Sequence, residues 1–224
     1  MIEKKLNLFA IDTSSKNISF SILWKGKLIN YNSKKISASD VIMYIQKYIE
    51  KFSISLKDID CFIIGKGPGS FMGLRISFSI IKAFSVSLDK PIISIGSFFS
   101  MAYQFIKKYQ KIAVLTDAKR SLIYGATFYY DGKNLRLENK EKLYNIFDFV
   151  SKRKDYFFIT YDEYIREETL KLFPDLNFYS KMVFPKAHYL LKIGLPYYLK
   201  ERFISLENLK PLYIYPKTCQ IKNV

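Results

Sequence analysis

The chain opens with the pattern of a buried strand and a hairpin. Apolar residues dominate positions 6–11 and stop at Asp12, and positions 18–24 then alternate between apolar and polar up to a turn at Lys25-Gly26. A continuous apolar run is typical of a buried strand, and alternation is typical of a strand with one face in the core. We therefore predict a strand, a turn, a second strand and, after the glycine, a third strand.

A second copy of this pattern lies near the middle of the chain. An apolar strand ends at Asp117, a basic turn leads into positions 122–130, and Asp131-Gly132 closes the hairpin. The two copies have nearly the same spacing from aspartate to glycine, which predicts a duplicated domain. Hairpins are common, so a chance match is the alternative. We place the two domains at residues 1–110 and 111–224.

Two segments of the first half have apolar residues at helical spacing. They are residues 39–52 and residues 73–88, and strands are predicted before and after the second of them. Strands that alternate with helices in this way predict an α/β protein, in which helices flank mixed sheets.

Both helices carry more apolar side chains than one face requires. A helix that packs on a sheet needs one apolar stripe, so the surplus must contact another helix or another protein. In one interpretation, the helices pack only against each other and the sheet. In the other, they form half of an intermolecular four-helix bundle. The residues predicted for that partner interface are Ile42, Ile45, Ile49, Leu74, Phe78, Ile81 and Ser85.

The composition is that of a protein with a large core and a basic surface. The 224 residues are 49% hydrophobic, and the formal net charge is +16. This charge attracts polyanions, so a stand-alone RNA-binding module is one hypothesis. The lysines are spread along the chain rather than clustered, and an AT-rich genome would impose the same abundance of Lys, Ile, Asn, Phe and Tyr on any protein.

Several classes of protein require residues that this chain lacks. His188 is its one histidine, and its two cysteines, Cys61 and Cys219, are far apart, so the ligands of a zinc hydrolase are missing. A serine triad would have to use His188, and no GxSxG motif precedes it. Every apolar run is broken before the ~20 residues of a membrane helix, and the first residues lack the pattern of a cleaved leader. We therefore expect a cytoplasmic protein without membrane contact.

A glycine-rich turn joins a predicted strand to the second helix. Its sequence, GKGPGSFMGLR, runs from Gly65 to Arg75 and matches neither the Walker A pattern nor GxGxxG. The turn is either a tight connection or an anion site, since backbone N–H groups at the start of a helix can bind an anion. The candidate anion or nucleotide contacts are Asp12, Gly67, Gly69, Ser70 and Arg75.

Three segments together resemble one known family. FAIDTS, GKGPGSFMGLR and LTDAKRSLIYG are similar to motifs of the bacterial TsaB (YeaZ) family, a subunit of the machinery that makes threonylcarbamoyladenosine in tRNA. The resemblance is good from Leu6 to Gly125 and weak beyond. It implies the ASKHA fold of actin and Hsp70, with two RNase H-like domains whose mixed sheets are flanked by helices, the second domain being reduced.

The resemblance also implies a division of roles among several subunits. A TsaB-like chain is a non-catalytic scaffold that pairs with a TsaD-like transferase and activates it, while a TsaE-like ATPase joins the assembly and tRNA is bound through the complex. No cofactor is then expected in this chain, because ATP and a metal belong to the partner subunits. A homodimer is a further expected form when the chain is alone.

The sequence departs from the family pattern in its first helix, where the usual histidine and proline are missing near Ala38 and Tyr44, and at four further positions. They are Met72, Lys119, Leu122 and Tyr215, where the family usually has other residues.

An independent ASKHA-type ATPase or phosphotransferase is the alternative function. In that hypothesis, Asp12 and Asp117 would approach a magnesium nucleotide. Neither aspartate is followed by a phosphate-binding loop, since Thr13-Ser14 and Ala118-Lys119 stand in those places. We therefore expect both aspartates to have structural roles in turns.

Overall fold

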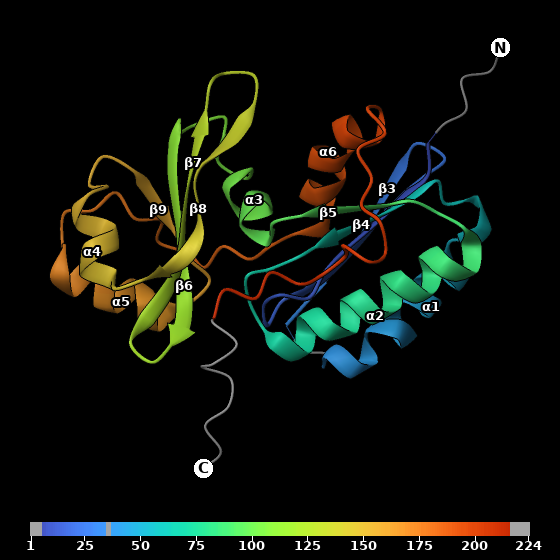
Figure 1. Cartoon of the computed structure of the whole chain (residues 1–224), viewed down its shortest axis with the longest axis horizontal. Coiled ribbons are helices and arrows are strands. Elements are labelled where there is room, and N and C mark those ends of the chain that lie inside the picture. The colour runs from blue at the N-terminus through green and yellow to red at the C-terminus, as the bar shows by residue number, and fades with distance from the viewer. Residues whose placement is uncertain (1–5, 35–36, 216–224) are drawn as a thin grey trace. The chain divides into compact units, whose positions relative to one another are not determined.

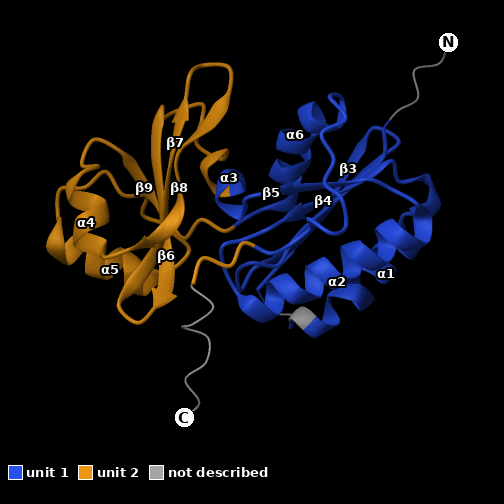
Figure 2. Ribbon diagram, viewed as in Figure 1, with its two compact units in different colours: residues 1–100, 185–211 blue, residues 101–184, 212–224 orange. Residues whose placement is uncertain are grey.

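The computed structural model describes residues 6–34 and 37–215 (Figure 1). The chain divides into two units, of which the first comprises Met1–Ser100 and Pro185–Pro211 and the second comprises Met101–Phe184 and Leu212–Val224 (Figure 2). Each unit has its own mixed sheet.

The first unit contains a five-stranded sheet in the order β3-β2-β1-β4-β5. Strands β1, β2 and β3 form an antiparallel meander, and β4 and β5 continue the sheet in parallel from β1. The bounds of the strands are β1 Leu8–Asp12, β2 Ile18–Trp24, β3 Lys27–Ser33, β4 Cys61–Gly65 and β5 Ile92–Ile95.

Helices cover both faces of this sheet. Alternate residues of β1 point to opposite sides: Phe9 and Ile11 lie in the core beneath α1 (Val41–Lys51) and α2 (Phe71–Leu88), whereas Leu8 and Ala10 pack with α6 (Ala187–Tyr198). Figure 1 shows α1 and α2 together on one side of the strands and α6 on the other. The short 3-10 helices η1 (Ala38–Asp40) and η2 (Leu56–Asp58) precede α1 and β4.

Residues 185–211 belong to the first unit, which differs from the division at residue 110 expected from the sequence. The physical reason is the packing of α6, whose Leu190 and Leu191 are buried against the first sheet. Gly194 allows a close approach, because a Cβ at this position would lie 2.6 Å from Ile63 Cδ1. The Ala187 N–H also donates a hydrogen bond of 2.8 Å to Ser19 Oγ on β2.

The second unit repeats the arrangement in reduced form. Its four-stranded sheet has the order β8-β7-β6-β9, with an antiparallel meander and one parallel neighbour instead of two. Helices α4 and α5 supply residues to its core. The repeated hairpin pattern thus forms a meander in each sheet, and the predicted α/β fold with mixed sheets flanked by helices is confirmed. The bounds are β6 Lys111–Lys119, β7 Leu122–Tyr130, β8 Leu135–Tyr144, α4 Ile146–Ser151, β9 Phe157–Ile159 and α5 Glu163–Leu172, and α3 (Ser97–Ala102) lies where the first unit leads into the second.

Candidate functional site

Asp12 ends β1 as a fully buried carboxylate. Its Oδ1 accepts hydrogen bonds from the Ser14 N–H at 2.9 Å and from the Ser14 hydroxyl at 2.6 Å. Its Oδ2 faces Gly65, where a Cβ would lie only 2.0 Å away. Burial raises the pKa of Asp12, and the hydrogen bonds from Ser14 oppose that rise without cancelling it.

The glycine-rich turn packs backbone against backbone on the turn that follows Asp12. The Ser70 N–H donates to the Ser14 carbonyl at 2.6 Å, and the Thr13 hydroxyl donates to the Gly73 carbonyl at 2.7 Å. A Cβ on Gly69 or Gly73 would lie 2.0 Å from a carbonyl oxygen of the facing turn. Glycine is therefore required at these two positions by close approach of the backbones.

The five residues expected to bind an anion are not assembled into such a site. The Gly67 N–H donates to Ser97 Oγ at 3.0 Å, and the Ser70 N–H is used as described above, so neither is available to a phosphate. Asp12 is a buried acid, and Arg75 lies exposed on α2 with its guanidinium 5.3 Å from the ring centre of Phe71. These contacts fit the interpretation of the turn as a tight connection. The turn also caps α2, because Ser70 Oγ accepts a hydrogen bond from the Gly73 N–H.

Five of the seven residues predicted at the partner interface lie in the core instead. Leu74, Phe78 and Ile81 are at most 4% exposed and pack against the first sheet with Ile45, while the buried Ser85 hydroxyl donates to the Lys90 carbonyl. Ile49 is half-buried against the same core, and Ile42 is exposed. This part of the prediction is wrong, because the most regular apolar stripe of a helix is the one that faces its own sheet.

The surplus of apolar side chains is nevertheless present on the opposite side of both helices. Val86 is 66% exposed and Met72 is 60% exposed, and they lie on the side of α2 that does not face the sheet. We call this surface the α1–α2 face. Its large exposed apolar residues are Ile42, Met43, Phe71, Met72 and Val86.

By length and composition alone, helix α2 could cross a membrane. This differs from the expectation that no segment of the chain is long and apolar enough to do so. A third of it is buried within the protein. Its buried side chains belong to the core of the first unit, and Arg75 and Lys82 interrupt its exposed side. These contacts explain its composition as that of a core helix with a second apolar face.

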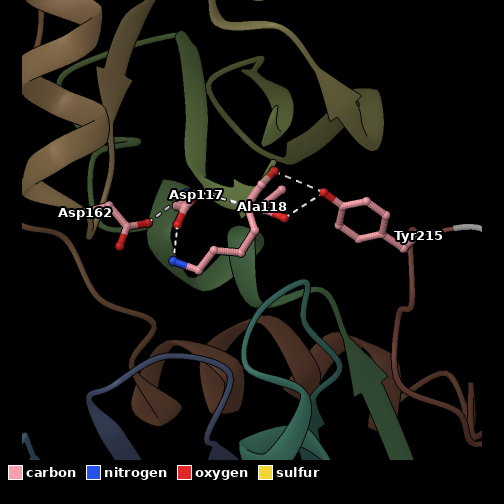
Figure 3. A network of polar contacts seen from close by, with 5 residues as sticks. Asp117, Ala118, Asp162 and Tyr215 are labelled. Atoms are coloured by element: carbon pink, nitrogen blue, oxygen red, sulfur yellow. Dashed lines mark hydrogen bonds and ion pairs between the residues drawn. The ribbon is translucent and has the colours of Figure 1, made fainter. Parts of the chain in front are cut away.

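Asp117 occupies the position in β6 that corresponds to Asp12 in β1, but its surroundings differ (Figure 3). Its carboxylate accepts a hydrogen bond of 2.7 Å from the Lys119 N–H and forms an ion pair with the Lys119 ammonium group. Its own N–H donates to Asp162 Oδ2 at 2.8 Å. The expected structural role of Asp117 in a turn fits these contacts.

The turn after Asp117 is held by the last described residue of the chain. The Tyr215 hydroxyl donates hydrogen bonds to the carbonyls of Ala118 at 2.8 Å and Lys119 at 3.1 Å (Figure 3). Three consecutive residues of this turn have a left-handed backbone, with φ values of 68°, 55° and 57° from Lys119 to Ser121. Non-glycine residues adopt this conformation only where neighbouring contacts hold them. Sequence reasoning noted Tyr215 only as a departure and did not predict this contact.

His188 has no companion for metal binding among the described residues. It lies half-buried in the first turn of α6, with its ring 4.0 Å from that of Tyr189. Burial and the nearby charges of Lys186 and Lys192 lower its pKa. Within residues 6–34 and 37–215, no group of three His, Cys, Asp or Glu side chains is placed to hold a metal ion.

The fold and these sites define a two-unit α/β protein with an exposed helical face. A family model described as "TsaD: tRNA N6-adenosine threonylcarbamoyltransferase" matches residues 33–168, more than half of the chain, and the chain belongs to this family.

Several similar relatives carry the name TsaB. The chain is 29% identical over 216 residues to the tRNA threonylcarbamoyladenosine biosynthesis protein TsaB of Buchnera aphidicola subsp. Schizaphis graminum, which covers 91% of this chain and 95% of that protein. It is 23% identical to the TsaB of Escherichia coli K12, over 93% and 94% of the two chains. The solved structure of YeaZ from Pseudomonas aeruginosa has the same fold, with a TM-score of 0.81 and 18% identity over 93% of this chain and 99% of that one.

Proposed function

We propose that this chain is a non-catalytic subunit of a complex that makes threonylcarbamoyladenosine in tRNA, and that it binds and activates a TsaD-like transferase. The names of its relatives supply the pathway. The observation that carries the scaffold role is the α1–α2 face, where two neighbouring helices expose large apolar side chains on the side away from their own sheet.

An apolar surface of this kind is typical of a protein interface. Exposed apolar groups that lie together mark contact sites more often than scattered ones do, and a pair of helices can be completed to a four-helix bundle by a pair from a partner. Met72 is prominent here although it departs from the family pattern. A methionine at an interface supplies a flexible apolar contact.

The surroundings of Asp12 and Asp117 support a non-catalytic role for this chain. Asp12 is sealed from solvent by the glycine-rich turn, and Asp117 is engaged by Lys119. ATP and a metal are therefore assigned to partner subunits, including a TsaE-like ATPase, and tRNA is bound through the assembly in the cytoplasm. The alternative, an independent ASKHA-type ATPase, would require magnesium-dependent ATP binding by the isolated chain, which calorimetry measures.

The test is a pair of substitutions on the exposed side of α2. Met72→Asp with Val86→Asp places two carboxylates in the proposed contact, where desolvation of unpaired charges opposes association. We expect this variant to lose the one-to-one complex with the TsaD-like protein of the same cell, as measured by size-exclusion chromatography with light scattering.

A matched control alters two exposed side chains of another helix. Tyr164→Asp with Leu172→Asp on α5 introduces the same charge at positions of similar exposure and should leave the complex intact. Both variants should unfold close to the temperature of the unmodified chain. A complex that survives the α2 substitutions would contradict the proposed interface.

A further inference from the structure

The charges on the α1–α2 face are almost all of one sign. Helix α2 contains Arg75 and Lys82, both exposed, and no Asp or Glu between Phe71 and Leu88. Helix α1 contributes exposed Lys47 and Lys51.

Helices α1 and α2 together contain one acidic residue, Glu50, which lies seven residues after Met43 and so on the same side of α1. Glu50 of α1 accepts a hydrogen bond of 2.9 Å from Gln46 Nε2, one turn before it. Asp40 precedes α1 and Asp89 follows α2, each as the capping residue. The centre of the face on α2 therefore has only cations among its charged groups.

One of these cations lies beside an exposed apolar group, and another lies beside a half-buried ring. The Arg75 guanidinium is 5.3 Å from the ring centre of Phe71, and the Lys47 ammonium is 5.2 Å from that of Tyr44. Cation–π contacts of this kind hold a charged group over the apolar surface. A partner that covers Phe71 and Met72 must therefore also meet the charge of Arg75.

We infer that this face selects a partner whose matching surface carries carboxylates, and that it discriminates electrostatically against a second copy of this chain. The inference rests on the proposed function and specifies the chemistry of its partner. In a symmetric dimer the same patch is used by both copies, so pairing through α2 would place Arg75 and Lys82 of one copy against a helix that carries the same two cations. No carboxylate on α2 is available to compensate them.

The first experiment measures self-association of the chain by sedimentation at about 50 mM and about 500 mM salt, since added salt shortens the range of charge repulsion. Self-association is expected to strengthen with salt. Mixing the unmodified chain with its Arg75→Glu, Lys82→Glu variant should give mixed dimers about tenfold tighter than the unmodified homodimer at low salt, because the charges are then opposite.

The second experiment measures binding to the TsaD-like protein. Affinity for the unmodified chain should fall as salt rises, and the Arg75→Glu, Lys82→Glu variant should bind about tenfold more weakly or worse. The control is Lys140→Glu with Lys142→Glu on the exposed part of β8, which changes the net charge equally and should alter affinity less than about twofold. Circular dichroism and the unfolding temperature verify that each variant is folded.

The outcomes separate this inference from the proposed function. If the Met72 and Val86 substitutions abolish the complex while reversal of Arg75 and Lys82 leaves affinity unchanged, the interface stands and the charge selection is overturned. If the unmodified chain does not bind the TsaD-like protein, the proposed function fails, and the mixing experiment alone decides the charge selection. Mixed dimers no tighter than the homodimer overturn it.

Discussion

The Asp12 carboxyl group is buried between the turn that follows it and the glycine-rich turn. Ser14 donates two hydrogen bonds to one of its oxygens, while the other faces Gly65. Because burial raises its pKa, the folded chain binds this proton more tightly than the unfolded chain does. The stability that the proton contributes is complete below the unfolded pKa and is lost as pH rises through the folded pKa.

Asp12→Asn should accordingly stabilise the first unit at neutral pH. The amide retains an oxygen for Ser14 and removes the buried charge, so we expect a higher free energy of unfolding near pH 7. This gain shrinks as the pH is lowered and the unmodified carboxyl takes up its proton. Urea unfolding at several pH values measures the difference.

Asp131 provides a control of opposite sign. This solvent-exposed carboxylate accepts hydrogen bonds from the N–H groups of Asn134 and Lys133, and these lower its pKa. Asp131→Asn should destabilise the protein at neutral pH, and the loss should shrink only as pH falls through the lowered pKa. An Asp12→Asn variant that behaved like Asp131→Asn would contradict the account of Asp12.

At the scale of elements, the hairpins were predictable and the orientation of the helices was not. Alternating residues in β2, the apolar and aromatic run of β7 and the glycines of the turns after them specify each meander locally. The apolar surplus of α1 and α2 was also visible in the sequence. Which side of α2 faces the sheet depends on contacts with residues far along the chain, and so Phe78 and Ile81 were assigned to the surface although they belong to the core.

A hydroxyl group of the last described residue supports the turn between β6 and β7. Tyr215→Phe removes the hydrogen bonds to the Ala118 and Lys119 carbonyls but retains the ring beside Tyr124. We expect a loss of about 1 kcal/mol. Amide exchange should accelerate between residues 117 and 122, where the left-handed residues lose their support.

The matching substitution at the other hairpin of the second unit is Tyr130→Phe. The Tyr130 hydroxyl donates to the Gly132 carbonyl at 2.7 Å, in the turn between β7 and β8. Its loss should accelerate exchange in that turn and leave residues 117–122 unchanged. Equal effects of the two substitutions on both turns would show that Tyr215 does not act locally.

At the scale of the whole molecule, the division into units does not follow the order of the chain. The first sheet is completed by α6, whose residues come after the entire second sheet. No local pattern in residues 185–211 indicates which sheet they cover, since an apolar helix face suits either one. The repeat of the two meanders therefore predicted the number of domains but not the membership of α6.

Gly194→Leu tests whether α6 covers the first sheet. A side chain at Gly194 would collide with Ile63 of β4, and overpacking of this kind typically costs about 1–3 kcal/mol. Hydrogen exchange should lose protection in β1 and β4 of the first unit. Protection of β6 and β7 should be retained, and a loss confined to those two strands would contradict the assignment.

The late position of α6 has a consequence for synthesis on the ribosome. Proteins emerge from the N-terminus and tend to fold domain by domain as they do so. The face of the first sheet that contains Leu8, Ala10 and Ile63 lacks its covering helix until residues 187–198 have been made. The strands and helices of the second unit, β6 to α5, all lie before that point. The unit whose translation begins first is therefore the one whose core closes last.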